Sequence, residues 1–170
     1  MPNIAYSLYH AIKSIVDRLI HPVKSTADTA LSTANTAITS LPRYEYGKDN
    51  IALDLTGAFR EYSFITLTTN KPSTKILVWA TIDILDNAQG TGSVVEYRLV
   101  ITPTGQPAQN GSVRRVNLPH GHRINASAMA HGTGHTTAGD VKIHLELKEN
   151  SGSARYIISE LIAVANPINA

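Results

Sequence analysis

The spacing of apolar residues changes once along the chain, near Leu41-Pro42. Before this point apolar residues recur every three or four positions, which is typical of an amphipathic helix. After it, short runs alternate between apolar and polar residues and are separated by Gly, Asn and Pro, which is typical of antiparallel strands. The pattern predicts a mainly β protein with an N-terminal α-helical stalk over residues 1–42 and an antiparallel β-sandwich head over residues 43–170.

The first half of the predicted helix carries a stripe of large aliphatic side chains. The stripe consists of Ile4, Leu8, Ile12, Ile15 and Leu19. Spacings of three and four place these residues on one helical face, and an exposed stripe of this kind marks a binding surface. We expect the helix to attach the chain to other proteins of a larger particle, or to bundle with its own copies.

The second half of the helix has a seam of small residues. Beyond His21-Pro22 the apolar positions again alternate four and three apart, as in a heptad repeat. They are Val23, Ala27, Ala30, Ala34, Ala37 and Leu41. Because alanine buries little surface, an isolated helix of this composition is marginal and needs neighbouring copies. Two questions stay open: whether Pro22 kinks one helix or starts another, and whether the Ser/Thr-rich stretch is a stalk or a flexible linker.

About eight strands are expected in the head. The clearest is 141–148, in which aliphatic residues alternate strictly with Lys, His and Glu. Asn110-Gly111 is the strongest hairpin dipeptide in the chain. The other expected strands are 51–55, 62–66, 76–82, 94–101, 113–118, 123–130 and 155–165. Antiparallel strands with no helices between them predict a sandwich.

The last expected strand, 155–165, is apolar on both faces. Ile157, Leu161 and Ala163 suit the core. The opposite face carries a second apolar set, which consists of Tyr156, Ile158, Ile162 and Val164. A strand that is apolar on both faces is covered on both faces, and no helix is left in the head to cover it. We therefore expect these four residues to form the interface between subunits of a homotrimer.

Composition narrows the function classes. Only 16% of the 170 residues are charged and the formal net charge is +2, which suits a β-rich surface protein better than a helical enzyme. The densest basic spot, Arg114-Arg115, lacks interleaved aromatic residues, so nucleic-acid binding is not expected. The chain has no cysteine, so the fold needs no disulfide, and cytosolic assembly is compatible with this. Neither a signal peptide nor membrane insertion is expected from the hydropathy pattern.

His120-Gly121-His122 is a candidate metal motif. If the segment is extended, both imidazoles lie on the same face, and near a three-fold axis six of them would converge. Imidazole suits zinc, iron, copper or nickel. We expect a transition metal held by His120 and His122 if this loop approaches the axis, and ordinary exposed loop histidines if it does not. No other cofactor is expected.

The sequence offers little for catalysis. It contains no Gly-x-Ser-x-Gly nucleophile elbow and no glycine-rich phosphate loop. The carboxylates of Asp83, Asp86 and Glu96 could in principle pair as in a glycosidase, but nothing in the sequence fixes their separation. We expect a protein that is not an enzyme.

The C-terminal segment resembles the ending of phage structural proteins. In it, an alternating strand that starts near Val141 leads through the hairpin Asn150-Ser151-Gly152-Ser153 into a final strand with Leu161 and Ala163. The earlier strand 76–83 matches the same order. Such endings close a jelly-roll head similar to the trimeric heads of tumour-necrosis-factor and complement-type globular domains. The family carries no catalytic motif.

The resemblance implies a homotrimeric protein of the virion surface, assembled in the host cytoplasm. It would be a fibre or spike whose head binds a host-surface glycan or protein and whose helix binds other virion proteins. A capsid decoration (cement) protein is the alternative. A second alternative is a carbohydrate-binding recognition module, which would need an exposed aromatic platform. The only tryptophan, Trp79, is expected in a central strand.

Overall fold

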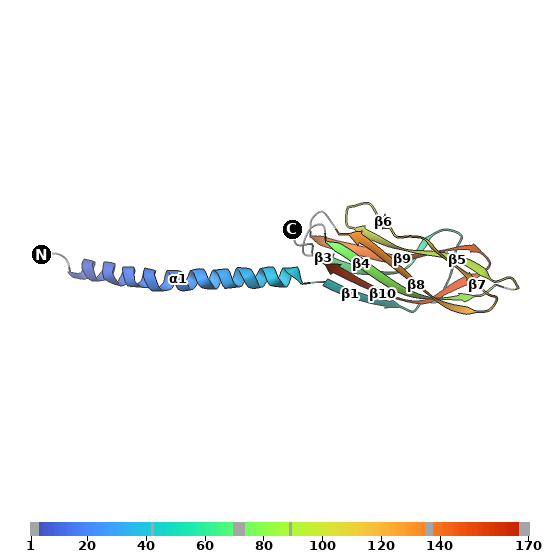
Figure 1. Ribbon diagram of the computed structural model, residues 1–170, viewed down its shortest axis with the longest axis horizontal. Coiled ribbons are helices and arrows are strands. Elements are labelled where there is room, and N and C mark those ends of the chain that lie inside the picture. Colours follow the sequence, from blue (N-terminus) through green and yellow to red (C-terminus); the bar gives the residue numbers. More distant parts are fainter. Residues whose placement is uncertain (1–3, 42, 70–73, 89, 135–137, 167–170) are drawn as a thin grey trace. The chain divides into compact units, whose positions relative to one another are not determined.

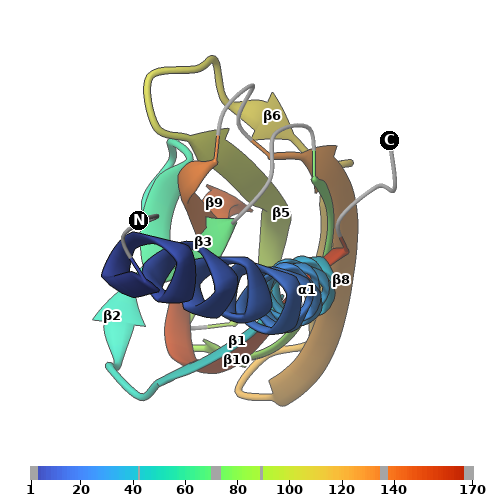
Figure 2. The same ribbon diagram turned by 90° about the vertical axis from the view of Figure 1, so that its left-hand side faces the viewer.

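The computed structural model describes residues 4–41, 43–69, 74–88, 90–134 and 138–166. The chain divides into two compact units, Met1–Ser40 and Leu41–Ala170; Figure 1 labels the helix and most of the strands, and Figure 2 labels β2. The first unit is helical and the second is a β-sandwich. The division falls next to the change in the hydrophobic pattern.

The helical unit is a single helix, α1 (Ile4–Ser40), which continues through Pro22. The two apolar seams of the sequence therefore lie on one helix. The large apolar side chains described along it, from Leu8 to Leu31, are all exposed in the isolated chain. Helical stability in proteins comes mostly from packing of an apolar face, and a single helix has no such packing within its own unit. Among the described residues, no helix combines the length and apolarity that a membrane span requires.

The head consists of two antiparallel sheets. One contains β1 (Arg43–Asp49), β10 (Ala154–Asn166), β4 (Lys75–Asp86) and β8 (Arg123–Thr133) in that order, and β2 (Leu53–Asp54) pairs with β10. The other contains β3 (Arg60–Thr69), β9 (Gly139–Ser151), β5 (Ser93–Pro103) and β6 (Gln109–Asn110), and β7 (Arg114–Leu118) pairs with β5. This is a β-sandwich of jelly-roll type, preceded by a helix, as predicted.

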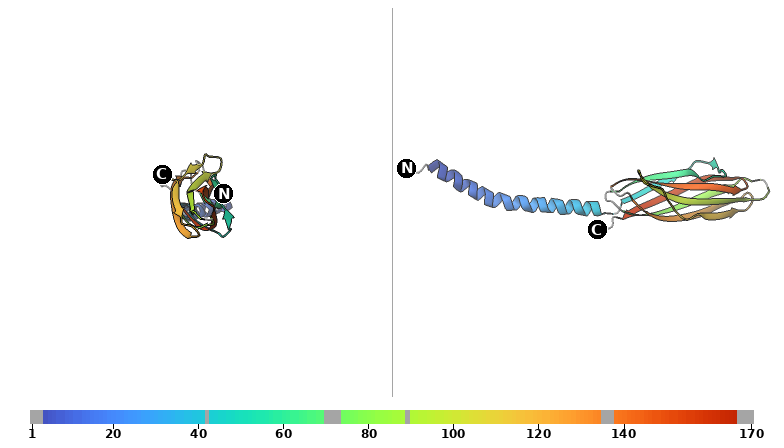
Figure 3. Two further views of the ribbon diagram at one scale, coloured as in Figure 1. Left: turned by 90° about the vertical axis from the view of Figure 1, so that its right-hand side faces the viewer. Right: turned by 90° about the horizontal axis from the view of Figure 1, so that it is seen from above.

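The core lies between the two sheets, which curl around it in the end-on view of Figure 2. It follows the alternation in the sequence. Val141, Ile143, Leu145 and Leu147 on β9 are completely buried, and the polar residues between them lie on the outer face. The long strands run lengthwise through the head, as the right-hand panel of Figure 3 shows. Loops are therefore gathered at its two ends.

The first strand differs from the prediction. The expected strand at 51–55 is reduced to the two-residue β2, while β1 begins earlier and pairs with β10 over its whole length. Tyr44 and Tyr46 alternate with Arg43 and Glu45 in this stretch, and aromatic residues at alternate positions favour a strand. The alternation of these two tyrosines could therefore have located β1 from the sequence.

A bulge in β10 changes which of its side chains reach the core. The pairing of β10 with β4 shifts register between Tyr156 and Ile158. As a result Tyr156 is completely buried, with its hydroxyl 2.8 Å from the Oγ atom of Ser159, and Ile157 is only half-buried. The predictions for Tyr156 as an interface residue and Ile157 as a core residue are both wrong, because strict alternation cannot anticipate an extra residue.

Strand β8 is the edge of its sheet, and side chains from the other sheet cover part of that edge. The hydroxyl of Tyr97 donates to the carbonyl of Ser127 at 3.2 Å. The amide side chain of Gln109 bonds twice to Thr133, accepting from its N–H and donating to its carbonyl, each at 2.8 Å. Gln109 thus pairs with the end of β8 as a neighbouring strand would.

Candidate self-association face

The outer face of the sheet β1-β10-β4-β8 carries a row of apolar side chains that crosses all four strands. Strand register places Tyr46 opposite Ile162, Ile162 opposite Trp79, and Trp79 opposite Met129. Ile162 is half-buried, while the other three are 39–57% exposed. Cross-strand neighbours on one face lie about 5 Å apart, so the four side chains form a continuous band.

A second apolar row lies beside the first. Tyr44 is opposite Val164, Val164 is opposite Leu77, and Leu77 is opposite His131. A groove with a volume of about 800 Å³ opens on this part of the face. Its lining includes Leu77, Trp79 and Val164, together with Gln109 from the other sheet. We call the seven apolar residues of the two rows the apolar face: Tyr44, Tyr46, Leu77, Trp79, Met129, Ile162 and Val164.

The remainder of the same outer surface is polar. Lys48 Nζ lies 3.0 Å from Glu160 Oε1, and this hydrogen bond raises the pKa of Lys48. Further along the sheet Asp83 accepts hydrogen bonds from Arg123 and, at 2.7 Å, from Asn125. These residues line a hollow of about 280 Å³. The apolar face therefore occupies only one end of the sheet, the end at which β1 begins.

The outer face of the opposite sheet is covered with ion pairs instead. Arg98 pairs with Glu146 at 2.7 Å and Lys148 with Glu96 at 3.0 Å, and the latter hydrogen bond lowers the pKa of Glu96. Its exposed Phe64 lies under the ammonium of Lys142, 4.8 Å from the ring centre. The two outer faces of the sandwich thus differ sharply in polarity.

The predicted interface residues are only partly brought together. Ile162 and Val164 lie in the two rows of the apolar face. Ile158 lies opposite Asp83 and lines the polar hollow, and Tyr156 is in the core. Trp79 does belong to a central strand, as expected, but its side chain is on the outer face.

Sequence reasoning missed most of the apolar face, which comes from strands far apart in the chain. Leu77, Trp79 and Met129 each stand at alternate positions between small or aliphatic core residues. The sequence signal that could have found them is a strand with apolar residues on both faces. This signal was used for β10, and β4 shows it as well.

The His120-Gly121-His122 segment is a tight turn and not an extended strand. The N–H of His122 donates to the carbonyl of Pro119 at 3.1 Å, and Gly121 has a φ of 69°, as the third residue of a type II turn requires. The assumption that both imidazoles share one face of an extended segment is therefore wrong. A metal shared by His120 and His122 of several chains stays a prediction.

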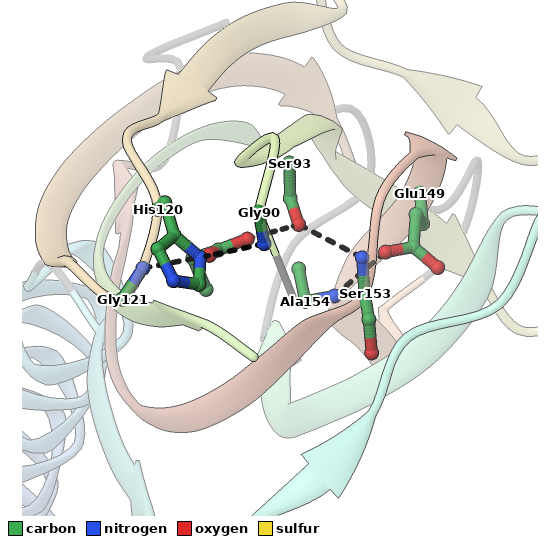
Figure 4. A network of polar contacts seen from close by, with 8 residues as sticks. Gly90, Ser93, His120, Gly121, Glu149, Ser153 and Ala154 are labelled. Carbon is green, nitrogen blue, oxygen red and sulfur yellow. Dashed lines mark hydrogen bonds and ion pairs between the residues drawn. The ribbon is translucent and has the colours of Figure 1, made fainter. Parts of the chain in front are cut away.

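His120 belongs to a polar network around the buried carboxylate of Asp86, and Figure 4 shows His120, Ser93 and Gly121 in this network. Asp86 accepts hydrogen bonds from the Ser93 hydroxyl and from the Gly121 N–H, the latter at 2.8 Å. His120 Nδ1 lies 3.5 Å from the carboxylate and accepts from the Gly90 N–H at 3.3 Å. Burial alone would raise the pKa of Asp86, but these hydrogen bonds outweigh it and the pKa lies below its ordinary value.

The network joins three segments at one end of the head. The Ser93 hydroxyl that donates to Asp86 also accepts from the N–H of Ser153 at 2.9 Å. In the same hairpin the N–H of Ala154 donates to Glu149 at 2.6 Å. These hydrogen bonds hold together the ends of β4, β7 and β9 and the starts of β5, β8 and β10. This arrangement orders the loops and leaves the side chain of Asp86 inaccessible to a substrate.

The three carboxylates considered for catalysis each have a structural partner. Asp86 is buried in its network, Asp83 is paired with Arg123, and Glu96 is paired with Lys148. Among the described residues, no group of three or more His, Cys, Asp or Glu side chains is placed to hold a metal ion within one chain.

The predicted attachment stripe lies on α1. Leu8, Ile12, Ile15 and Leu19 are all more than half exposed; the side chain of Ile4 lies outside the described ones.

Similarity to known proteins is confined to the fold. No protein-family model and no curated protein matches the chain. A solved structure of the infectious bursal disease virus Gx strain has a TM-score of 0.53 and 10% identity, covering 76% of this chain and 33% of that one. The VP2 subviral particle of the same virus gives 0.49 and 11%, covering 74% and 32%. Eiger TNF from S. frugiperda gives 0.47 and 11%, covering 76% and 94%.

This chain spans about a third of the length of the viral protein whose fold it shares. The likeness shows that the fold of most of this chain also occurs in a virus structure.

Proposed function

We propose that the chain is a non-enzymatic structural protein of a virus particle, displayed on its surface as a homotrimeric fibre or spike. The observation that carries the proposal is the difference between the two outer faces of the sandwich. A complete sandwich that still presents two adjacent rows of apolar side chains needs a cover, and copies of the same chain supply one. The fold shared with a virus structure supports the viral assignment.

The two ends of the head serve different purposes in this proposal. The apolar face, at the end where β1 begins, holds the subunits together. The opposite end carries loops that the Asp86 network orders, and it is the end we assign to a host-surface glycan or protein. Weak sites on three chains add through high effective concentration. The number three rests on the resemblance of the C-terminal segment to trimeric heads.

The test is the oligomeric mass of the purified protein in solution. Ile162→Asp places a charge in the middle of the apolar face and should dissociate the assembly, because a buried unpaired carboxylate is costly. Phe64→Asp is the matched control, since it introduces the same charge on the ion-paired face of the other sheet. Sedimentation should show a trimer for the wild type and for Phe64→Asp, and a smaller species for Ile162→Asp. A monomeric wild type would overturn the proposal.

A capsid decoration protein would use the same face and helix. It differs in where the molecule stands: a decoration protein lies on the capsid shell, whereas a fibre or spike projects from it. Imaging intact particles with this protein in place distinguishes the two.

A carbohydrate-binding module is favoured by one observation. Trp79 lies on an outer face, next along the sheet to a polar hollow that contains Asp83, Asn125 and Arg123. A sugar ring could stack on the indole while its hydroxyls bond in the hollow. In that case Trp79 fluorescence would respond to added glycans, whereas an indole covered by another subunit would not.

A further inference from the structure

The helix α1 contains an 11-residue sequence repeat. Residues 8–18 are LYHAIKSIVDR and residues 19–29 are LIHPVKSTADT. Comparing them position by position gives five identities in eleven, and a sixth position exchanges Ile for Val. The matched pairs are Leu8/Leu19, His10/His21, Lys13/Lys24, Ser14/Ser25, Asp17/Asp28 and Ile12/Val23.

A third unit, residues 30–40, keeps only the apolar positions of the repeat. Ala30, Ala34 and Ala37 stand where Leu19, Val23 and Thr26 stand in the second unit. Leu41 then occupies the position at which a fourth unit would begin. The side chains along this apolar seam therefore become smaller, from large aliphatic residues at its N-terminal end to alanine at its C-terminal end.

The repeat has a geometric meaning because α1 is one helix through Pro22. Eleven residues in three turns is about 3.67 residues per turn, slightly more than the 3.6 of a straight α-helix. Equivalent positions of successive units therefore stay on a face that winds slowly around the helix. The repeated charged residues, Lys13 with Asp17 and Lys24 with Asp28, fall on the opposite side at a spacing of four, which suits exposed ion pairs.

The only polar residue in the seam has its hydroxyl already bonded. Thr26 Oγ1 donates to the carbonyl of Pro22 at 2.9 Å. The hydroxyl donor is therefore satisfied inside the helix, and burial of this side chain against a neighbour leaves no unpaired donor. A threonine in this state packs much like a small aliphatic residue.

The 11-residue period competes with a heptad. A heptad seam extended from the second half of α1 into the first would pass through Ile20, Val16 and Lys13. It would bury the charge of Lys13 and leave Ile12 and Leu19 outside. The seam with the 11-residue period buries Ile12 and Leu19. It leaves the four repeated charged residues exposed, and so it accounts for the sequence better than the heptad does.

We propose that α1 forms a parallel, in-register, right-handed coiled coil with the α1 helices of the other copies of this chain. An 11-residue repeat imposes right-handed supercoiling, whereas a heptad imposes left-handed supercoiling. A partner helix must therefore share the 11-residue period to remain in contact over three units. A second copy of this chain has the same sequence and so has the same period. This proposal rests on the proposed homotrimer and assigns the stripe from Leu8 to Leu19 to self-association instead of attachment to other proteins.

The absence of cysteine from the sequence makes the register directly measurable. Single cysteines are placed in the full-length chain at neighbouring positions: Ile15→Cys against Val16→Cys, and Leu19→Cys against Ile20→Cys. A disulfide requires Cβ atoms about 4 Å apart, so under mild oxidation the first member of each pair should yield about fivefold more linked dimer than the second. Asp17→Cys and Asp28→Cys should yield almost none.

The opposite preference, Val16→Cys and Ile20→Cys over their neighbours, would overturn the proposal in favour of a left-handed heptad coiled coil. Little linkage at any position, in a protein that sediments as a trimer, would also overturn it while leaving the homotrimer intact. A full-length wild type that sediments as a monomer would instead refute the homotrimer itself. Each failure is thus distinguishable.

A second measurement avoids cysteine. Deleting residues 19–29 removes one whole unit and keeps the remaining units in phase, whereas deleting residues 19–25 keeps only a heptad in phase. The helix signal of the 11-residue deletion should melt at the higher temperature, although it removes more of the seam. The reverse order would contradict the proposed period.

Discussion

Trp79 on β4 lies directly opposite Ile162 on β10, and both side chains are on the outer face of the sheet. Because Trp79 is the only tryptophan in the chain, its fluorescence reports whether this face is covered. In the assembled protein we expect emission typical of an apolar environment and weak quenching by acrylamide.

Ile162→Asp should shift the emission of Trp79 to longer wavelength and increase acrylamide quenching, because dissociation exposes the indole to water. Phe64→Asp should leave both unchanged. The measurement is a pair of emission spectra at equal concentration, with far-UV circular dichroism to verify that the variants are folded. A wild-type spectrum already typical of exposed indole would argue against a covered apolar face.

Asp86→Ala should destabilise the head by about 2–3 kcal/mol, because it leaves the buried Gly121 N–H and the Ser93 hydroxyl without their acceptor. The matched control is Asp83→Ala, which removes a carboxylate of the same type from an exposed pair with Arg123 and should cost about 0–1 kcal/mol. Denaturant unfolding of the two variants gives the comparison. Equal losses would mean that the network does not stabilise the loops.

The contribution of Asp86 should depend on pH in a defined direction. Its pKa in the folded protein is lowered, so its stabilising effect is fully present above the unfolded pKa of about 3.9 and is lost as pH falls through the folded value. The difference in melting temperature between wild type and Asp86→Asn should therefore be constant near neutral pH and shrink in strong acid. A difference that grows in acid would contradict the assigned direction.

Two glycines in the loops at this end should respond differently to alanine. Gly121 and Gly152 both have positive φ, of 69° and 95°. At Gly121 an added Cβ has open space, so Gly121→Ala should cost only the left-handed backbone strain of about 1–2 kcal/mol. At Gly152 the Cβ would lie 2.7 Å from the Gly92 carbonyl oxygen, so Gly152→Ala should cost about 3 kcal/mol.

Thermal unfolding of the two variants ranks them, and equal losses would show that the hairpin relaxes around the added methyl group. The Gly121 variant serves as the internal control for backbone strain alone.

A fragment of residues 43–170 should fold without α1. The sandwich contains the whole hydrophobic core of the described residues, and the helix forms a separate compact unit. We expect a cooperative melt with near-UV circular dichroism like that of the full-length head. A fragment that precipitates or lacks near-UV structure would mean that the helix contributes to the stability of the head.

Much of the fold could be predicted from alternation. Period-two runs located β4, β5 and β9, although each observed strand extends one to four residues beyond the predicted bounds at each end, and the three-and-four spacing located α1. Alternation failed at Tyr156, because the bulge inserts one residue between Tyr156 and Ile158 and places Tyr156 on the core side, opposite to the face expected from the later residues of the strand. It also failed at His120, where a glycine able to adopt positive φ makes a turn out of a segment that had been assumed to be extended.

The candidate site was less predictable than the fold, because it depends on register between strands distant in the sequence. Ile162 could be proposed from β10 alone. Its neighbours Tyr46, Trp79 and Met129 become neighbours only when four strands are aligned, and no local pattern encodes that alignment. The helix repeat, in contrast, was fully present in the sequence, and its meaning became clear when α1 proved continuous through Pro22.

The side chain of Gln109 has a consequence for how large an assembly of this chain can grow. By bonding to both backbone groups of Thr133 it occupies a place that the strand of another molecule would otherwise take. Tyr97 does the same for the carbonyl of Ser127. Growth by edge-to-edge addition of strands has no natural limit, whereas association through faces around a rotation axis closes on itself. Covering part of this edge while leaving a face apolar favours a small closed oligomer over an endless polymer.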